Sequence, residues 1–310
     1  MKKLSFILQG KDLHWVGDGF PVRNIFSYND TWKNTKITDI FSPFLLIDYA
    51  GPMIFPASEN KLGVGPHPHR GFETVTIVFH GEVEHRDSTG SKGIIGPGDV
   101  QWMTAAAGIV HEEFHGKDFA RRGGTFEMVQ LWINLSKKDK MSSPKYQTIY
   151  SHEIPQILLP NNAGNLRVIA GNYQGIKGVA ETFGPVNLWD IWAKSGHQVR
   201  LKLPQGHSAG VCLLKGVLKL QEENKILEGP SLAVFDSQNC NLNLKAEEDS
   251  HFLFLGGRPM AEPIVANGPF VMNTAEEIQQ AFEDFRQGNI AHRPRSWPPS
   301  EWRHEPHDLL

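Results

Sequence analysis

Short apolar runs broken by turn residues constrain the fold of this chain more than any other feature. They recur from Leu13 to about Leu255, and Gly, Pro, Asn and Asp residues separate them. In the stretch from Thr74 to His85, apolar and smaller residues alternate with a period of two until Gly81 breaks the run, which is a β-hairpin pattern. A chain with this pattern is expected to fold as an all-β sandwich or barrel.

The length of the chain predicts two domains. With 310 residues it is long for one ordinary domain, and its 30 Gly and 20 Pro residues favour a turn-rich β protein over a disordered one. The polar segment Leu135–Tyr146 (LSKKDKMSSPKY) carries Pro144 and is the expected linker. We therefore predict one barrel over residues 1–140, a second barrel over 141–290, and a tail over 291–310.

A weak internal repeat is consistent with two similar domains. TIVFHGEVE in the first half resembles VCLLKGVLK in the second, and in both halves an apolar strand ends at a glycine, Gly81 or Gly216. A second strand then follows a Gly-Pro turn that contains Pro97 or Pro230. Duplication of one barrel explains the repeat, and the alternative is that any two β domains share glycine turns.

One helix is expected near the end of the sequence, from Ala275 to about Gln287. Thr274 can cap its first turn while Glu277 reaches back to complete a capping box, and Gly288 ends the helix. An apolar stripe along this helix is typical of core packing and carries no chemistry. The stripe consists of Ile278, Ala281, Phe282 and Phe285. The tail that follows receives no role.

Charge, cysteines and hydropathy exclude several classes of protein. The formal net charge is −3 and the basic residues are scattered, so direct nucleic-acid binding is not expected. Cys212 and Cys240 match no metal-site or redox spacing. The apolar run Leu4–Leu8 is too short for a signal peptide, and no segment approaches the roughly 20 apolar residues that span a bilayer. We expect a cytoplasmic monomer without membrane contact.

Two histidine-containing segments carry the candidate chemistry. HPHRGFE begins with His67 and His69, whose side chains point to one face if the segment is a strand, because side chains in a strand repeat with a period of two. HEEFH places His111 and Glu113 on one face under the same condition, with Glu112 on the other. Three imidazoles and one carboxylate on neighbouring strands form a set that binds a divalent transition metal and leaves open positions.

Other residues near these segments are weaker candidates. His115 shares the face of His111 and is a spare ligand or a supporting group. Glu73 is expected to be a surface or strand-end charge. His85, in EHRDS, is expected at a solvated strand end, with a supporting role at the metal as the alternative. The ligand types do not select among iron, manganese, nickel, cobalt, copper and zinc.

The five residues HEEFH also match H-E-x-x-H, the motif of zinc hydrolases. In that motif two histidines one helical turn apart bind zinc and the glutamate activates water. The alanines at 105–107 favour a helix, whereas Gly108, Ile109 and Val110 disfavour one. The helical interpretation also leaves the HPHRGFE segment without a role, so a zinc hydrolase is the minor alternative.

Longer segments resemble the pirin family, whose members are two-barrel proteins of the cupin superfamily. The resemblance lies in HPHRGFETVT from His67, PGDVQWMTAAAGIVHEE from Pro97 and LLIDYAGP near Leu45, and it extends to about Gly288. It implies an all-β fold of two tandem cupin β-barrels of the jelly-roll type, with a carboxy-terminal helix.

The resemblance also implies a ligand set. The amino-terminal barrel of pirins holds a non-haem iron through three histidines and one glutamate, and the second barrel has no metal site. On the repeat alignment Lys202 and Pro204 stand where the two histidines of HPHRGFE stand. The ligands carried over to this sequence are His67, His69, His111 and Glu113.

Three functions are consistent with this sequence. Some pirins resemble quercetin 2,3-dioxygenases, so the first is the dioxygen-dependent ring opening of a small aromatic, flavonol-like substrate, with Glu113 as the catalytic base for its hydroxyl. The second is a redox-responsive iron-binding regulatory module that engages a protein partner, either a transcription factor or a metabolic enzyme. The third is a degenerate or storage-type cupin that binds adventitious metal. No sequence feature separates the first two.

Overall fold

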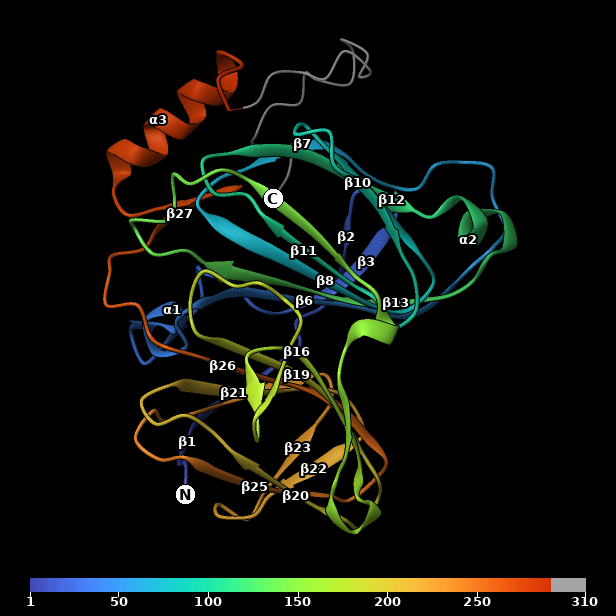
Figure 1. Cartoon of the computed structure of the whole chain (residues 1–310), viewed down its shortest axis with the longest axis vertical. Coiled ribbons are helices and arrows are strands. Elements are labelled where there is room, and N and C mark those ends of the chain that lie inside the picture. Colours follow the sequence, from blue (N-terminus) through green and yellow to red (C-terminus); the bar gives the residue numbers. More distant parts are fainter. Residues whose placement is uncertain (291–310) are drawn as a thin grey trace. The chain divides into compact units, whose positions relative to one another are not determined.

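β-strands dominate the structure and form two barrels. The computed structural model describes residues 1–290 (Figure 1), and the tail predicted at 291–310 lies outside the described residues. The chain divides into two compact units, each built from several segments. The histidine barrel comprises Leu13–Arg23, Leu46–Ser151 and, among the described residues, 261–290. The apolar barrel comprises Met1–Asp12, Asn24–Leu45 and His152–Met260.

Two sheets form the histidine barrel. The order of the larger sheet is β14-β11-β8-β13-β6-β3-β2, and the order of the smaller is β10-β9-β12-β7. The larger contains β14 (Lys145–Ile149), β11 (Val100–Thr104), β8 (Phe72–His80), β13 (Gly124–Asn134), β6 (Phe44–Phe55), β3 (Phe20–Phe26) and β2 (Leu13–Val16). The smaller contains β10 (Lys92–Ile95), β9 (Val83–Asp87), β12 (Ile109–His115) and β7 (Gly63–His69). A short helix, α2 (Lys117–Arg122), connects β12 to β13.

The interior of the histidine barrel is partly apolar and partly polar. Val78 of β8 belongs to its apolar core, and Thr76, two residues earlier, contacts Gln130 of β13 instead. Because side chains alternate along a strand, one inner face carries both kinds of side chain. The buried apolar cluster consists of Phe20, Val22, Ala50, Phe55, Val64, Val78, Val83, Ile95, Phe119, Phe126 and Met128.

The apolar barrel has the same two-sheet construction, with the orders β1-β24-β21-β26-β19-β16-β15 and β20-β25-β22-β23. The larger sheet contains β1 (Leu4–Gln9), β24 (Ser231–Phe235), β21 (Ser208–Lys215), β26 (Ser250–Gly257), β19 (Val186–Ala193), β16 (Gly164–Ala170) and β15 (Gln156–Leu158). The smaller contains β20 (Gln198–Lys202), β25 (Asn241–Ala246), β22 (Val217–Leu220) and β23 (Lys225–Glu228). Its core is a large hydrophobic cluster, and it also buries polar side chains such as Asp190 and His251. The remaining short elements are β4 (Thr31–Trp32), β5 (Thr35–Lys36), α1 (Ile37–Ile40), η1 (Ser151–Glu153), η2 (Pro160–Asn162), β17 (Asn172–Tyr173) and β18 (Ile176–Lys177).

The strand order repeats between the barrels, which supports duplication of one barrel. Read from the same end, β10-β9-β12-β7 corresponds to β23-β22-β25-β20, and β8-β13-β6-β3-β2 corresponds to β21-β26-β19-β16-β15. The glycines of the sequence repeat follow β8 and β21. Gly81 has φ +86° and Gly216 has φ +91°, a backbone conformation that favours glycine.

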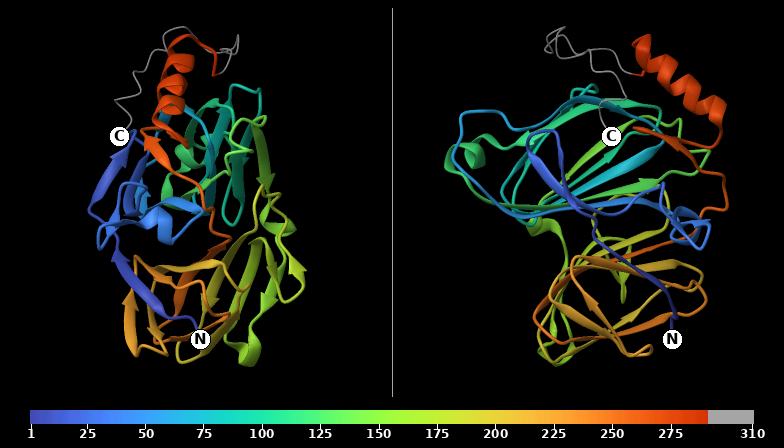
Figure 2. Two further views of the ribbon diagram at one scale, coloured as in Figure 1. Left: turned by 90° about the vertical axis from the view of Figure 1, so that its left-hand side faces the viewer. Right: turned by 180° about the vertical axis from the view of Figure 1, so that it is seen from behind.

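The helix predicted near the end of the sequence is confirmed. α3 (Ala275–Arg286) follows β27 (Val265–Asn267) and β28 (Phe270–Met272) and is the red helix of Figures 1 and 2. Its capping box is complete, because the Thr274 side chain accepts from the Glu277 backbone N–H and the Glu277 side chain accepts from the Thr274 backbone N–H. Gly288, with φ +76°, follows the end of the helix.

The carboxy-terminal segment belongs to the histidine barrel. Ile278 of α3 shares an apolar cluster with Val110 of β12, and Arg70, buried at the end of β7, forms an ion pair of 2.7 Å with Asp284 of α3. The compact units therefore interleave along the chain. The expected division into 1–140 and 141–290 had instead given this helix to the second barrel, because contacts between residues so distant in sequence leave no local pattern.

The polar segment predicted as a linker does not separate the two compact units, so that prediction is wrong. It lies inside the histidine barrel, whose middle segment continues to Ser151. Lys140 exposes 1% of its surface and donates hydrogen bonds to the carbonyl oxygens of Gly71 and Val271 and to the side chain of Asn134. Burial lowers the pKa of Lys140 to about 7, and its three hydrogen bonds, rather than its charge, join the packed segments.

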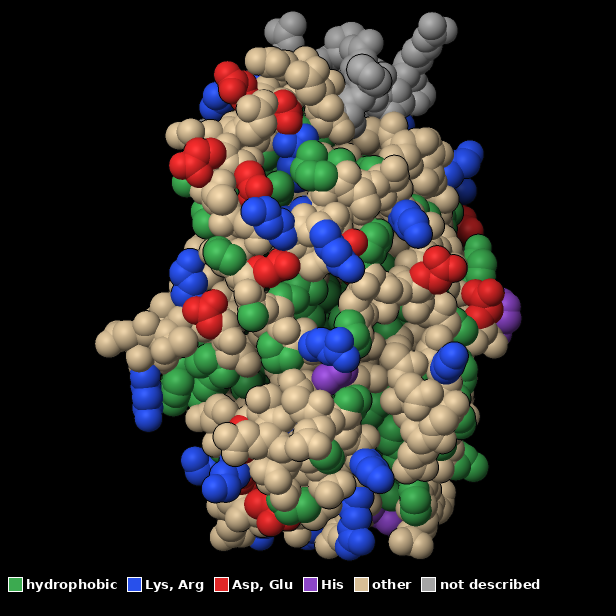
Figure 3. All heavy atoms as spheres, turned by 60° about the vertical axis from the view of Figure 1, so that its left-hand side comes forward, with side chains coloured by type: hydrophobic (Ala, Val, Ile, Leu, Met, Phe, Trp, Pro, Cys, Tyr) green, Lys and Arg blue, Asp and Glu red, His purple; other side chains and the backbone are tan. Residues whose placement is uncertain are grey.

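Surface charge and the state of the cysteines can be compared with what the sequence predicted. The face drawn in Figure 3 carries basic and acidic side chains interspersed with one another. Cys212 is buried and Cys240 is partly buried, and both are free thiols. None of the helices found in residues 1–290 combines the length and the apolar character required to cross a bilayer.

Candidate metal centre

The two histidine segments lie on adjacent antiparallel strands, β7 and β12. In their register His67 is opposite His111, and His69 is opposite Ile109. The strand geometry that the HPHRGFE pattern predicted for His67 and His69 is therefore confirmed. HEEFH is part of strand β12, so the helix that a zinc hydrolase motif requires is absent from this segment and that alternative is not supported.

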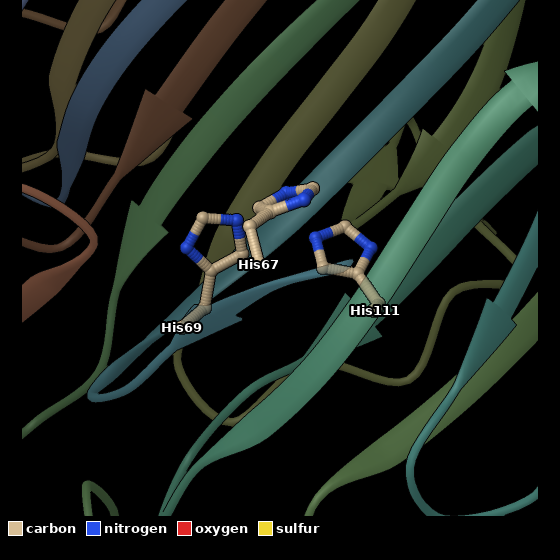
Figure 4. Close-up of side chains that lie close together, drawn as sticks. All are labelled: His67, His69 and His111. Atoms are coloured by element: carbon tan, nitrogen blue, oxygen red, sulfur yellow. The ribbon is translucent and has the colours of Figure 1, made fainter. Parts of the chain in front are cut away.

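Three imidazoles converge inside the histidine barrel. One ligand atom from each of His67, His69 and His111 lies within 4.8 Å of the other two. Figure 4 shows that each ring directs a nitrogen into the space between them. The ring centroids of His67 and His111 are 4.2 Å apart, and His67, the most exposed of the three, exposes only 9% of its surface. Bulk water is therefore largely excluded from the cluster.

The hydrogen bonds of these rings leave one nitrogen of each free for a metal. The Nδ1 atoms of His67 and His69 face the carbonyl oxygens of Gly65 (2.8 Å) and Pro269 (3.4 Å). Because a carbonyl only accepts, each Nδ1 must carry the proton, and each Nε2 keeps its lone pair. The Nε2 of His111 is buried and has no hydrogen-bond partner within residues 1–290. Two nitrogen lone pairs and the unpartnered Nε2 of His111 share one buried space, which fits a transition-metal ion.

Burial also favours the protonation state that binds metal. Desolvation lowers the pKa of His67, and it lowers the pKa values of His69 and His111 well below the usual histidine range. The neighbouring imidazoles add to this effect, because a positive charge on one ring disfavours a positive charge on the next. The three rings are consequently neutral at physiological pH, which is the form that ligates metals.

Glu113 lies beside the histidine cluster. Its ligand atom falls within 4.8 Å of those of His85 and His111, so the structure contains two groups that meet at His111. Among the described residues no single group at this distance contains all four predicted ligands. An irregularity in the β7–β12 register between His111 and Glu113 separates the two positions. The inclusion of Glu113 in one ligand set with the three histidines stays a prediction.

Two glutamines hold the Glu113 carboxylate. Gln101 donates to Oε1 at 2.7 Å and Gln130 donates to Oε2 at 3.1 Å. Aromatic donors fix the orientation of both amides, because Tyr146 donates to the Gln101 oxygen (3.2 Å) and Trp132 donates to the Gln130 oxygen (3.4 Å). The amide nitrogens therefore face the carboxylate, and both of its oxygens act as acceptors.

Three of the weaker candidates differ from their expected roles. His115 lies among the rings of Phe20, Phe55, Phe119 and Phe126, bonds to the Gly19 carbonyl and belongs to neither metal group. Glu73 exposes 2% and is not a surface charge. His85 exposes 1%, so the expected solvated strand end is wrong. The signal for His85 was present, since His85 and Asp87 repeat the period-two spacing of the HPHRGFE histidines.

The apolar barrel carries leucines at the corresponding strands. Lys202 and Pro204 are exposed, while Leu201 and Leu203 are buried in the core, so the repeat alignment places the wrong face of the strand against the two histidines. A shift of one residue exchanges the two faces of a strand. Leu201 of β20 is paired with Leu242 of β25, and neither side chain offers a donor atom to a metal.

The comparisons with known proteins agree with this architecture. Two family descriptions match the sequence, "Pirin" over residues 25–133 and "Pirin C-terminal cupin domain" over residues 188–291. A Pseudomonas aeruginosa protein named "Putative quercetin 2,3-dioxygenase" is 52% identical over 290 residues, covering 94% of this chain and 99% of that protein. The protein named "Pirin" of Homo sapiens is 35% identical over 264 residues, covering 82% and 85%.

A solved structure is similar over nearly the whole chain. The crystal structure of a quercetin 2,3-dioxygenase from Acinetobacter baumannii matches with a TM-score of 0.90 and 49% identity, covering 94% of this chain and 98% of that one. Together with the two family descriptions, this match confirms the expected fold of two cupin barrels.

Proposed function

This chain belongs to the pirin family, and from that premise we propose that it is a metal-dependent dioxygenase of the quercetin 2,3-dioxygenase type. The observation that carries the proposal is the convergence of three buried, neutral imidazoles beside a carboxylate whose two oxygens are held by amide donors. The proposed ligands are His67, His69, His111 and Glu113. Iron is the proposed metal through the family, since imidazole and carboxylate ligands alone do not select it.

Glu113 is proposed as the catalytic base. The hydroxyl O–H bond of the substrate breaks, the proton moves to a Glu113 oxygen, and the electron pair stays on the aromatic substrate as its anion. Gln101 and Gln130 keep the carboxylate in place for this transfer. A transition metal bound to the histidines supplies Lewis acidity for the substrate oxygen and redox chemistry with dioxygen.

An aromatic wall beside the cluster supports an aromatic substrate. Phe72 and Trp132 stack with ring centroids 4.3 Å apart, and both lie near His69, at 5.1 Å and 5.2 Å. Phe72 is fully buried and supports the Trp132 ring, which keeps 9% of its surface exposed and is the ring that another aromatic ring could contact. A small flavonol-like molecule is the proposed substrate class.

The test combines metal analysis with dioxygen uptake on the same samples. We expect near-stoichiometric iron in anaerobically purified protein and dioxygen uptake with quercetin, and we expect both to be lost in His69→Ala and Glu113→Ala. His14→Ala, which removes an exposed histidine from β2, is the matched control and keeps both. Metal retained by both site variants would mean that the ligand set is wrong.

A regulatory metal-binding module is the second candidate function. It is favoured by burial, because none of the three histidines exposes more than 9% of its surface, which leaves little access for a substrate the size of a flavonol. Near-stoichiometric metal without dioxygen uptake over a panel of flavonols would favour this candidate. A protein partner that binds the ferrous and ferric forms equally would count against it.

A further inference from the structure

Behind the metal-facing histidines lies a buried pair, His85 and Asp87 of β9, that the proposed function does not use. The His85 Nε2 and the Asp87 Oδ2 are 3.0 Å apart, and neither side chain has any exposed surface. On the other side of the pair, the His85 Nδ1 faces the Nδ1 of His111 at 3.4 Å. The order of contacts is therefore Asp87, His85, His111 and then the space where the three imidazoles converge.

We propose that Asp87 and His85 are positioning residues that fix the tautomer of His111 and so keep its Nε2 lone pair available to the metal. The proposal rests on the proposed metal site, and it concerns how this chain prepares one ligand for it. Nothing in the pairing register requires such a pair, since β9 and β12 are held together by backbone hydrogen bonds whatever the side chains.

The direction of the hydrogen bonds follows from Asp87. Its Oδ1 accepts from the backbone N–H and the hydroxyl of Thr89 and from the backbone N–H of Ser91, so Asp87 acts as an acceptor in this turn. Its Oδ2 then accepts from the Nε2–H of His85. With its Nε2–H directed at Asp87, His85 meets the Nδ1 of His111 through its own Nδ1, and there it acts as the acceptor of the proton on Nδ1 of His111. The Nε2 of His111 is left bare, in agreement with its lack of a partner within the described residues.

We call the chain of hydrogen bonds from Asp87 through His85 to His111 the relay. Tyr146 connects the relay to the carboxylate of Glu113. Its ring stacks on His85 with centroids 4.5 Å apart and planes 14° apart, which restrains the imidazole. Its hydroxyl donates to Gln101, which in turn donates to Glu113. One aromatic residue therefore restrains the supports of both His111 and Glu113.

His85 as a direct ligand is the competing interpretation. Its ligand atom lies within 4.8 Å of those of His111 and Glu113, and a separation of 3.4 Å also suits two nitrogens on one ion. That arrangement would use the Nδ1 of His111 and leave its buried Nε2 without a function beside His67 and His69. The unpartnered Nε2 therefore favours the relay.

Asp87→Asn inverts the relay with little change of shape. The turn donors of Thr89 and Ser91 require an oxygen at Oδ1, so the amide nitrogen of the variant replaces Oδ2 and points a donor at His85. His85 then moves its proton to Nδ1, where it meets the N–H of His111. The proton of His111 is displaced to Nε2 and competes with the metal. We expect the affinity for Co²⁺ to fall roughly tenfold to hundredfold, the usual effect of losing an outer-shell partner.

The matched control is Asp190→Asn. Asp190 is a buried carboxylate of the apolar barrel that accepts from the Nε2 of His251 at 2.6 Å and from the Nε of Arg167 at 2.9 Å, away from the metal groups. The variant reports what the loss of a buried His–Asp contact, together with this ion pair, does to the fold, and so sets an upper limit on the purely structural effect. His85→Gln, whose side-chain oxygen can accept from His111, is expected to retain more Co²⁺ affinity than His85→Leu.

The readout is the proton NMR spectrum of Co²⁺-loaded protein in water, together with Co²⁺ affinity by chelator competition. Each imidazole bound through Nε2 gives one strongly shifted, exchangeable Nδ1–H signal, so the relay predicts three signals in the wild type, one of them lost or in fast exchange in Asp87→Asn. A fourth signal that disappears in His85→Leu would overturn the relay in favour of direct ligation. Three signals and an unchanged affinity in Asp87→Asn would also overturn it, while the proposed dioxygenase would stand. Wild-type protein that binds no Co²⁺ would reject the metal site itself, and the relay with it.

Discussion

Replacing Glu73 with glutamine is expected to stabilise the histidine barrel above neutral pH and to leave its stability unchanged in acid. Glu73 is buried, and desolvation raises the pKa of its carboxyl from 4.5 to about 7. Because the folded-state pKa lies above the unfolded value, the protonated carboxyl makes its full contribution to the free energy of unfolding below pH 4.5. That contribution is lost as the pH rises through about 7. The pKa difference between 4.5 and about 7, at about 1.4 kcal/mol for each pKa unit, lowers the free energy of unfolding of the wild type by about 3 kcal/mol at alkaline pH.

Glutamine avoids this loss because it cannot ionise. Its side-chain oxygen can still accept the hydroxyl of Thr104, which donates to Glu73 at 2.7 Å. Urea unfolding of metal-free wild type and Glu73→Gln at pH 4 and pH 9 measures the effect, with Glu59→Gln, a change at an exposed position, as the control. The same stability difference at both pH values would refute the reasoning.

Three further predictions follow from buried polar groups. Lys140→Met leaves three acceptors unpaired and should lower the free energy of unfolding by about 3 kcal/mol, at about 1 kcal/mol for each bond, measured by urea titration; an unchanged midpoint would contradict it. Tyr146→Phe removes the donor that orients Gln101, and we expect kcat for dioxygen uptake to fall roughly tenfold with little change in melting temperature; equal kcat values would exclude that role. Because burial lowers the pKa values of His69 and His111 well below the usual range, Co²⁺ affinity should hold between pH 8 and pH 6; a steep decline around pH 6.5 would show ordinary histidines.

Local patterns were sufficient where the structure depends on local periodicity. The alternation in β8 and the spacing of His67 and His69 predicted strands and a shared face, because both follow from the pleat of a single strand. The capping box at Thr274 predicted the start of α3, because it involves residues within one helical turn. None of these inferences required knowledge of which segments pair.

Features that depend on long-range pairing could not be predicted in this way. His85 meets His111 and Glu113 only because β9 pairs with β12. Lys140 is polar in the sequence, yet it is buried because carbonyls from Gly71 and Val271 come together around it. Hydrophilic sequence indicates exposure only when no distant partner supplies hydrogen bonds.

The two barrels have the same strand order but different residues at the strands that carry the predicted metal ligands. They share a strand order, but the pair His67 and His111 occupies the β7–β12 ladder, whereas Leu201 and Leu242 pair in the corresponding β20–β25 ladder. The apolar barrel forms a core of hydrophobic residues at those strands. The histidine barrel therefore carries imidazoles on a ladder where the apolar barrel carries leucines.

The most direct test of the central claim is the anomalous diffraction of an iron-loaded crystal, measured at the iron edge. The account predicts one ion in the histidine barrel, about 2.1 Å from the Nε2 atoms of His67, His69 and His111, with an oxygen of Glu113 as the remaining protein ligand. An ion bound through the Nδ1 of His111, or one bound away from the three imidazoles, would contradict it.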